Sequence, residues 1–359
     1  MKGASMKIFH NIWIALLVLF FSVIIFGYSI FHYELSGPSD DNSLKVIEIE
    51  PGGISEIAAT LKEEDLIKNE LFFKVYVKLT GKTNLKAGTY SLSEDMGVAK
   101  IVDILENGSS SNQLAITFKE GLSMRKIAKV IEENTNNSED MVYSLLKDRE
   151  YLNTLIGKYW FLSDAILDDG IYYSLEGYLY PSTYHFGSED TTVEVIIETM
   201  LDEMEKQLAD YKDSINNNTN SFHDILTLAS IVELEGVTLE DRKSIAGVFY
   251  NRLNSNMNLG SDVTTYYGAL IDMGDRDLYS SEVNECNNYN TRCATFKTLP
   301  ISPICNPSID SILAVLEPDN NDYYYFVADK NRKVYFSNNI NEHNNTITKL
   351  KNNDLWYEY

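Results

Sequence analysis

The sequence has few of the residues that hold metal ions or build redox centres. It contains three cysteines and five histidines in 359 residues. No C-x-x-C pair occurs, and the histidines stand singly at positions 10, 32, 185, 223 and 343. Zinc sites need such ligands in closely spaced groups, so the sequence indicates neither a metal enzyme nor any cofactor. A Cys286–Cys293 bridge is permitted outside a membrane, and free thiols at these positions and at Cys305 are an equal alternative.

Basic residues are also scarce. The chain has 30 lysines and arginines against 53 aspartates and glutamates, a net charge of -23. This balance lacks the electrostatic signature of nucleic-acid binding, so no nucleic-acid partner is expected. The hydrophobic fraction of 44% is enough for substantial cores, and the length favours two or more domains. A polar substrate without phosphate groups fits this composition best.

One long hydrophobic run stands at the N-terminus. Residues 12–31, "IWIALLVLFFSVIIFGYSIF", carry no charge, and a helix of this length crosses a hydrocarbon core of about 30 Å. We therefore predict a transmembrane helix over 12–33. Lys2 and Lys7 precede it and acidic residues follow it, which places residues 1–11 in the cytoplasm and the rest outside. A cleaved signal peptide is the alternative interpretation.

After a polar linker over 34–44, the sequence predicts a small α+β module over 45–109. Ile47 and Ile49 alternate with polar residues as in a strand, and "GTYSL" is typical of a returning strand. Helical spacing joins Ile54, Ile57, Ala58 and Leu61, and a second helix carries Leu71, Phe72, Val75 and Leu79. A further helix is expected near Val98 to Glu106, and "NGSSSN" marks the domain boundary.

The larger domain, 110–359, is predicted to be mixed and mostly helical. It opens with a strand, a glycine turn and a helix in "QLAITFKEGLSMRKIAKVIEEN", whose buried stripe is Ile127, Ala128 and Ile131. Residues 221–272 read as helices, and capping boxes are expected at Ser221 with Asp224 and at Thr238 with Asp241. Two short strands around Lys330 and a terminal helix complete a chain of the α+β class.

The helix "HDILTLASIVELEGV" is apolar around its circumference and yet ends in two acids, Glu233 and Glu235. A helix with apolar residues all round is normally buried. Burial and the negative end of the helix dipole both disfavour an ionised carboxylate, so either acid is expected to hold a proton more readily than in water. A protonated acid at neutral pH is what cleavage of a glycosidic bond requires. The alternative is an ion pair with Arg242 or Arg252, which we favour for Glu235 but not for Glu233.

Several motifs, in order, resemble the endolytic murein transglycosylases of the YceG-like family. They are "ITFKEGLSMRKIA", "EGYLYPSTY", "LASIVELEG", "DRKSIAGVFYNRLNSNMNLGSDVTTYYG", "NNYNTR" and "LPISPICNPS". The module after the N-terminal span resembles the LysM-like region of that family. The chain departs from the family pattern at Val263, Ser182, Leu234 and Arg292.

The resemblance implies a plasma-membrane enzyme, with its catalytic domain on the outer face, that cuts nascent peptidoglycan glycan strands internally. The family's catalytic glutamate corresponds to Glu233. It is expected to protonate the oxygen between N-acetylmuramic acid and N-acetylglucosamine. It then takes the proton of the muramic C6 hydroxyl, which closes a 1,6-anhydro ring. No second carboxylate is required, and Glu235 is expected either to raise the proton affinity of Glu233 by like-charge repulsion or to hold a neighbouring residue. Association with the cell-wall synthesis complex is a further expectation.

Substrate contacts are predicted at Glu235, Asn251, Asp262, Tyr289, Asn290 and Glu176. Helix capping is the alternative for Asp262, and a structural role is the alternative for Glu176. Two other functions stay open at this point. A muramidase would use Glu235 to activate water, and a non-catalytic membrane protein would only bind peptidoglycan.

Overall fold

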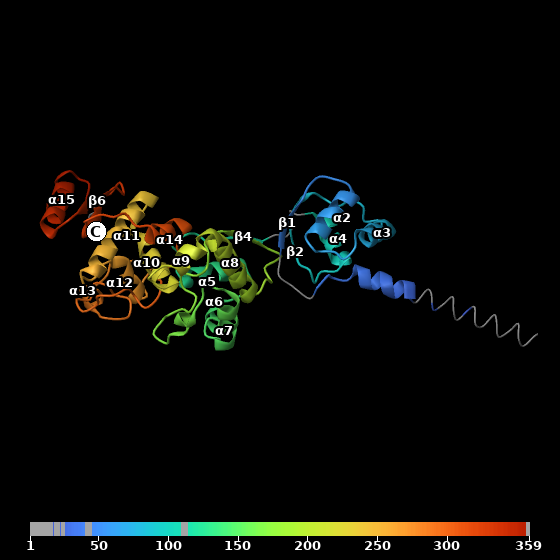
Figure 1. Ribbon diagram of the computed structural model, residues 1–359, viewed down its shortest axis with the longest axis horizontal. Coiled ribbons are helices and arrows are strands. Elements are labelled where there is room, and N and C mark those ends of the chain that lie inside the picture. The colour runs from blue at the N-terminus through green and yellow to red at the C-terminus, as the bar shows by residue number, and fades with distance from the viewer. Residues whose placement is uncertain (1–16, 18–21, 23–25, 40–44, 109–113, 357–359) are drawn as a thin grey trace, which may run out of the picture. The chain divides into compact units, whose positions relative to one another are not determined.

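The computed structural model describes residues 17, 22, 26–39, 45–108 and 114–356 (Figure 1). These residues divide into two compact units. Unit 1 comprises Met1–Ala115 with His185–Ser188, and unit 2 comprises Ile116–Tyr184 with Glu189–Tyr359.

The predicted cytoplasmic residues 1–11 and most of the predicted span 12–33 lie outside the described residues. Residues 26–35 form a helix. Within the described part of the chain, no helix has the length and apolar character needed to cross a membrane. The span therefore stays a prediction from the sequence.

Unit 1 contains the small α+β module that the sequence predicts. Strands β1 (Lys45–Ile49) and β2 (Gly88–Leu92) pair antiparallel, with Ile47 opposite Tyr90. Helices α2 (Ile54–Glu63), α3 (Glu70–Thr80) and α4 (Val98–Asn107) complete it. Both isoleucines of β1 point into the core, as their alternation predicts, together with Ile57, Ala58 and Leu61 of α2.

Helix α3 buries a different face from the one that the sequence pattern suggests. Phe73 and Val77 pack into the core of unit 1, whereas Leu71, Val75 and Leu79 are 64%, 37% and 73% exposed. The helix carries apolar residues on two faces, and tertiary packing selects only one of them.

The predicted strand, glycine turn and helix follow at residues 114–134, where unit 2 begins. Strand β3 (Leu114–Thr117) pairs with β4 (Thr183–Phe186), and α5 (Met124–Asn134) buries Ile127, Ala128 and Ile131 as expected. The helices that follow are α6 (Glu139–Leu145), α7 (Arg149–Lys158), α8 (Val193–Leu208) and α9 (Lys212–Asn216). Short 3₁₀ turns occur at Asp164–Leu167 and Ala209–Tyr211.

The centre of unit 2 is helical. It contains α10 (Phe222–Glu235), α11 (Leu239–Asn254), α12 (Asp262–Gly268), α13 (Ser280–Asn284) and α14 (Ile309–Leu316). Helices α10, α11 and α14 pack against one another. Every residue of α10 from Ile225 to Val232 is buried, so the helix is a core element as its composition predicts. Both predicted capping boxes, Ser221 with Asp224 and Thr238 with Asp241, are confirmed.

The C-terminal part forms the predicted hairpin and helix. Strands β5 (Tyr325–Ala328) and β6 (Val334–Ser337) pair antiparallel, and α15 (Ile340–Asn352) contacts both. In the described residues the chain is thus a mixed α+β protein in which helices predominate.

Candidate active site

Glu233 lies in the last turn of α10, where the buried helix reaches the edge of the core. Its side chain is only 6% exposed. Gly236 ends the helix, and the chain returns at once as α11. This return brings Arg242, whose side chain is 10% exposed, back against the end of α10.

Both carboxylate oxygens of Glu233 are held by hydrogen-bond donors. Arg242 Nη2 donates to Oε1 at 2.8 Å. The backbone N and the Oγ of Ser308 donate to Oε2 at 2.9 and 2.6 Å, and Ser311 Oγ donates to the same oxygen at 2.8 Å. Ser308 is the N-cap of α14, so the carboxylate also faces the positive end of that helix.

Arg242 is fixed in this position by two further contacts. Its Nη1 donates to Ser308 Oγ at 3.1 Å, and its Nε donates to the carbonyl of Gly236 at 3.3 Å. The guanidinium therefore ties the end of α10 to the start of α14. We use the name cradle for Arg242, Ser308 and Ser311.

The cradle corrects one expectation from the sequence. Glu233 is buried as predicted, but its carboxyl group meets polar donors and not an apolar pocket. The ion pair with Arg242 belongs to Glu233, whereas the sequence interpretation favoured such a pair for Glu235. The reason is that Arg242 follows α10 by one tight turn, and the Ser308 donors come from a segment 75 residues later.

Glu235 faces a different part of the molecule. Its Oε1 accepts a hydrogen bond from Ser261 Oγ at 2.6 Å, and its charged neighbours are Asp262, Arg292 and Arg252. Burial raises the pKa of this carboxyl group above its ordinary value. Residues two apart on a helix are separated by roughly 200° around its axis. The structure therefore gives no support to a role for Glu235 in repelling charge on Glu233.

Glu120 lies in a turn beside Glu233, and the sequence reasoning missed it. It precedes Gly121, which adopts a positive φ of 74°. A Cβ atom on Gly121 would lie 3.8 Å from Cγ of Glu233 and 3.2 Å from Cδ2 of Leu234. The turn after β3 thus passes directly against the end of α10.

The surroundings of Glu120 favour its protonated form. Partial burial raises the pKa of Glu120, and the charges of Glu233 and Asp310 raise it further, against an opposing effect of Arg242. Because the residue as a whole is exposed, solvent screens part of this effect. The "FKEGLSM" turn, interpreted from the sequence only as an element of the fold, therefore supplies a second acid to the site.

Glu176 is a buried structural link between the segments that form the site. It accepts hydrogen bonds from the backbone N of Met124 at 2.9 and 3.0 Å and from Tyr267 Oη at 2.9 Å. Asn306 Nδ2 donates to it at 3.3 Å, and the carbonyl of Asn306 accepts from the backbone N of Gly121 at 2.9 Å. Glu176 thus helps to fix both the Glu120 turn and the segment that leads to Ser308.

Glu176 should give the protein a measurable pH dependence of stability. Burial raises its pKa from 4.5 to about 8, against hydrogen bonds that lower it. The folded state therefore binds a proton that the unfolded state has already released. The stability that this proton contributes is complete at acid pH and is lost as the pH rises through the pKa of the folded state. A Glu176→Gln variant should not lose stability in this way as the pH rises. The difference in unfolding free energy between the two proteins should change by up to about 1.4 kcal/mol per pH unit between those values. Urea unfolding at several pH values measures it, and parallel pH profiles would contradict it.

The structure places Tyr289 and Asn290 inside the fold. Tyr289 packs against Tyr172 and Tyr267 at ring-centroid distances of 4.6 and 4.8 Å, and both predicted contact residues are fully buried. Asn290 Nδ2 donates to the carbonyls of Val283 and Glu285 at 3.0 and 2.6 Å. Side chains used in this way hold the loop together and do not present themselves to a ligand.

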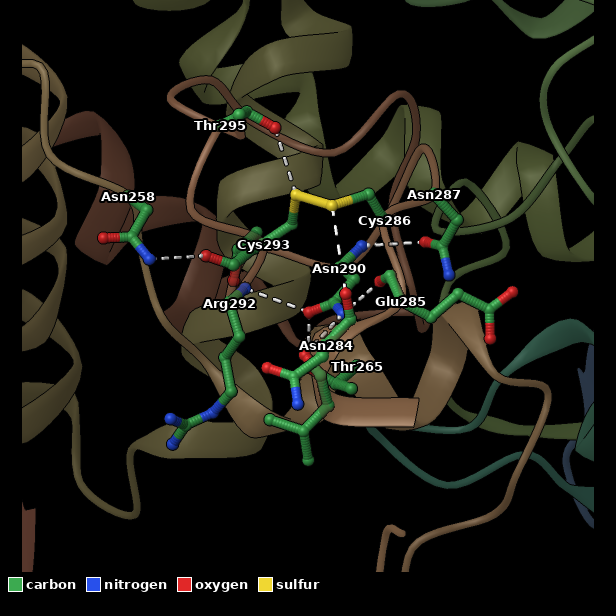
Figure 2. Close-up of a disulfide and its surroundings, with 12 residues drawn as sticks. Asn258, Thr265, Asn284, Glu285, Cys286, Asn287, Asn290, Arg292, Cys293 and Thr295 are labelled. Atoms are coloured by element: carbon green, nitrogen blue, oxygen red, sulfur yellow. Dashed lines mark hydrogen bonds between the residues drawn. A yellow bond between two sulfur atoms is a disulfide. The ribbon is translucent and has the colours of Figure 1, made fainter. Parts of the chain in front are cut away.

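A disulfide closes the same loop. Cys286 and Cys293 are bridged, with their Cα atoms 5.3 Å apart, and Cys305 is a buried free thiol (Figure 2). Beside the bridge, Arg292 N donates to Asn290 Oδ1 at 3.0 Å. Of the two alternatives that the sequence left open, the structure therefore contains the bridge.

Asn251 and Asp262 also have protein partners. Asn251 Nδ2 donates to the carbonyls of Asn321 and Tyr323 at 2.8 and 2.9 Å, which ties α11 to the segment before β5. Asp262 begins α12 and pairs with Arg292, with Nη2 at 2.9 Å. Within the described residues, no hydrogen bond joins Glu233 to any of the predicted substrate-contact residues.

Comparison with known proteins gives consistent matches over most of the chain. The model of the YceG-like family matches residues 47–349. An endolytic murein transglycosylase of Bacillus subtilis is 36% identical over 334 residues, which are 91% of each chain. One of Streptococcus pneumoniae is 32% identical over 349 residues, 92% of this chain and 63% of that protein.

A solved structure agrees with these matches. The crystal structure of a yceG-like protein from Listeria monocytogenes has a TM-score of 0.61 and 34% sequence identity to this chain. The match covers 85% of this chain and 99% of the other. The chain belongs to the YceG-like family.

Proposed function

We propose that this protein is an endolytic murein transglycosylase, a carbon–oxygen lyase that cleaves peptidoglycan between N-acetylmuramic acid and N-acetylglucosamine. The observation that carries the proposal is Glu233, a nearly buried acid held by an arginine and two serines at the end of a core helix. The similarity to endolytic murein transglycosylases over 91% of the chain supports it.

In the proposed reaction, a carboxyl group donates a proton to the glycosidic oxygen as the bond to C1 of the muramic residue breaks. The C6 hydroxyl of the same residue attacks C1 and gives up its proton to Glu233. One proton enters the leaving group and one returns to the enzyme, so no water is consumed. Arg242, Ser308 and Ser311 hold the carboxylate in one orientation throughout.

Glu120 is the second acid of this site. The negative charge of Glu233 disfavours ionisation of Glu120, so Glu120 keeps its proton to a higher pH than an isolated glutamate. The positive charge of Arg242 lowers the pKa of Glu120, whereas the negative charge of Asp310 in α14 raises it. The pair supplies the protonated acid that the first step needs.

A Glu120→Gln variant should shift the pH dependence of cleavage. Without the second carboxylate, the site should lose its proton at lower pH, so the alkaline limb of the kcat/KM profile should move to lower pH. The loss at the optimum should be smaller than about 10²-fold, the lower range for removal of a general acid–base group. Glu133→Gln, on the exposed side of α5, is the matched control. An unchanged profile would remove Glu120 from the mechanism.

The location of the enzyme is part of this proposal, and the sequence supports it. Residues 12–33 anchor the chain in the plasma membrane, the N-terminus is cytoplasmic, and the catalytic unit acts on the outer face. Peptidoglycan is the substrate, and association with the cell-wall synthesis machinery remains an expectation of the family resemblance.

The lengths of the released glycans test this function. Full-length enzyme in detergent should convert long, uncrosslinked strands into intermediate lengths, because an endolytic enzyme cuts at internal bonds. Chromatographic sizing of the strands measures this. Release of disaccharides alone would contradict internal cleavage. Co-sedimentation with peptidoglycan without any shortening would support the binding role.

A further inference from the structure

One face of α3 in unit 1 is apolar and exposed along its whole length. Leu71, Val75 and Leu79 recur every four residues, so they lie in one stripe about 12 Å long. The opposite face, with Phe73 and Val77, is buried in the core of unit 1. We call Leu71, Val75 and Leu79 the α3 stripe. Among the described residues, the core of unit 1 does not include the α3 stripe.

The chain around the stripe is basic within an acidic protein. Residues 71–93 contain no aspartate or glutamate but have lysines at 74, 78, 82 and 86, although the net charge of the whole chain is -23. Lys74 pairs with Glu70 at 2.9 Å, and Lys82 pairs with Asp103. Among the described residues Lys78 makes no ion pair, and it is exposed next to Leu79.

The N-terminal helix contacts the beginning of α3. The rings of Phe31 and Phe72 lie 5.9 Å apart. Lys68 Nζ lies 3.9 Å from the ring centroid of Tyr33 and donates to Ser36 Oγ at 2.8 Å. This helix includes the last residues of the uncharged run 12–31, so the part of that run that the structure describes ends beside α3 (Figure 1).

We propose that α3 lies on the lipid surface, with Leu71, Val75 and Leu79 inserted at the boundary between headgroups and acyl chains. The inference depends on the membrane anchor of the proposed function. Apolar residues along one side of a helix with flanking lysines are typical of interfacial helices. Lysine stems can reach along the apolar surface while their ammonium groups contact anionic headgroups. The contact would hold unit 1 against the membrane.

The depth of α3 can be measured on the full-length protein. Leu79→Cys and, separately, Val75→Cys carry an NBD fluorophore, and the protein is reconstituted into vesicles of equal parts phosphatidylglycerol and phosphatidylethanolamine. Val46→Cys is the matched control, because Val46 is also an exposed apolar residue but lies on β1, at the other end of unit 1 (Figure 1). Cys305 is buried, and the other two cysteines are bridged.

The expected result is strong quenching of the labels at 75 and 79 by lipids with a doxyl group near the headgroup, and weak quenching by aqueous iodide. The label at 46 should behave in the opposite way. Labels on α3 that iodide quenches as strongly as the control would overturn the inference. Labels shielded from both quenchers would also overturn it, because a protein surface would then cover the stripe. Protein that fails to float with the vesicles would instead refute the anchor itself.

Discussion

Replacing Glu233 with glutamine is expected to slow glycan cleavage by about 10²–10⁴-fold, the range for loss of a general acid–base group. Glutamine has nearly the same shape, and its carbonyl oxygen can still accept from Ser308 and Ser311, so α10 and α14 should stay folded. The variant should nevertheless lose some stability, because Arg242 loses its ion-pair partner. The amide can neither donate an acidic proton nor remove one from a hydroxyl group. Initial rates of glycan shortening measure the loss.

Glu235→Gln is the control for this result. Glu235 stands on the same helix and accepts a hydrogen bond from Ser261, which a glutamine oxygen can also accept. It does not contact the cradle, so its replacement should leave most of the activity intact. Circular dichroism should show that both variants are folded. If Glu233→Gln cleaves at the wild-type rate, or if Glu235→Gln is equally inactive, the assignment of the catalytic acid is wrong.

Replacing Arg242 with methionine is expected to destabilise unit 2 by about 3–5 kcal/mol, the usual cost of leaving one partner of a buried ion pair alone. Glu233 would keep its serine donors but would lose its only ion-pair partner in the described structure, in a site where it is 6% exposed. The contacts of Arg242 with Gly236 and Ser308 would also be lost. Denaturant unfolding monitored by fluorescence measures the change.

A second substitution separates charge from packing in this experiment. In Arg242→Met combined with Glu233→Gln, no buried carboxylate is left uncompensated, so the double variant should be less destabilised than the sum of the single changes. Arg149→Met removes an exposed ion pair with Asp169 and should leave stability almost unchanged. If the Arg242→Met variant is as stable as the Arg149→Met variant, the cradle does not depend on the ion pair between Arg242 and Glu233.

The features that the sequence predicted well depend on residues close together in the chain. The capping boxes at Ser221 and Thr238 each involve a partner three residues away. The strand alternation at Ile47 and the apolar circumference of α10 are likewise local patterns. Such signals fix where elements begin and which of them are buried.

The features that the sequence did not predict depend on contacts between distant segments. Ser308 reaches Glu233 from 75 residues away, and the Glu120 turn comes from the start of unit 2. Nothing in the local pattern around either residue indicates these partners. In α3 the pattern allowed two apolar faces, and only the packing of unit 1 decides that Phe73 is buried and Leu71 exposed.

The separation of Glu233 from Glu235 could have been predicted from the sequence alone. Glu233 and Glu235 are two residues apart on a helix, so their side chains point to nearly opposite sides. The structure accordingly gives them separate partners, Arg242 and Ser261. Glu235 is therefore not placed to activate a water molecule for attack at a bond that Glu233 protonates.

The chemistry of the new chain end tests the central claim most directly. Full-length enzyme is incubated with peptidoglycan in water enriched in heavy oxygen, and the released muramic ends are analysed by mass spectrometry. If the C6 hydroxyl closes the ring with Glu233 as base, the ends are 1,6-anhydro sugars, one water lighter than reducing ends and without heavy oxygen. Reducing ends that carry heavy oxygen from the solvent would contradict the account.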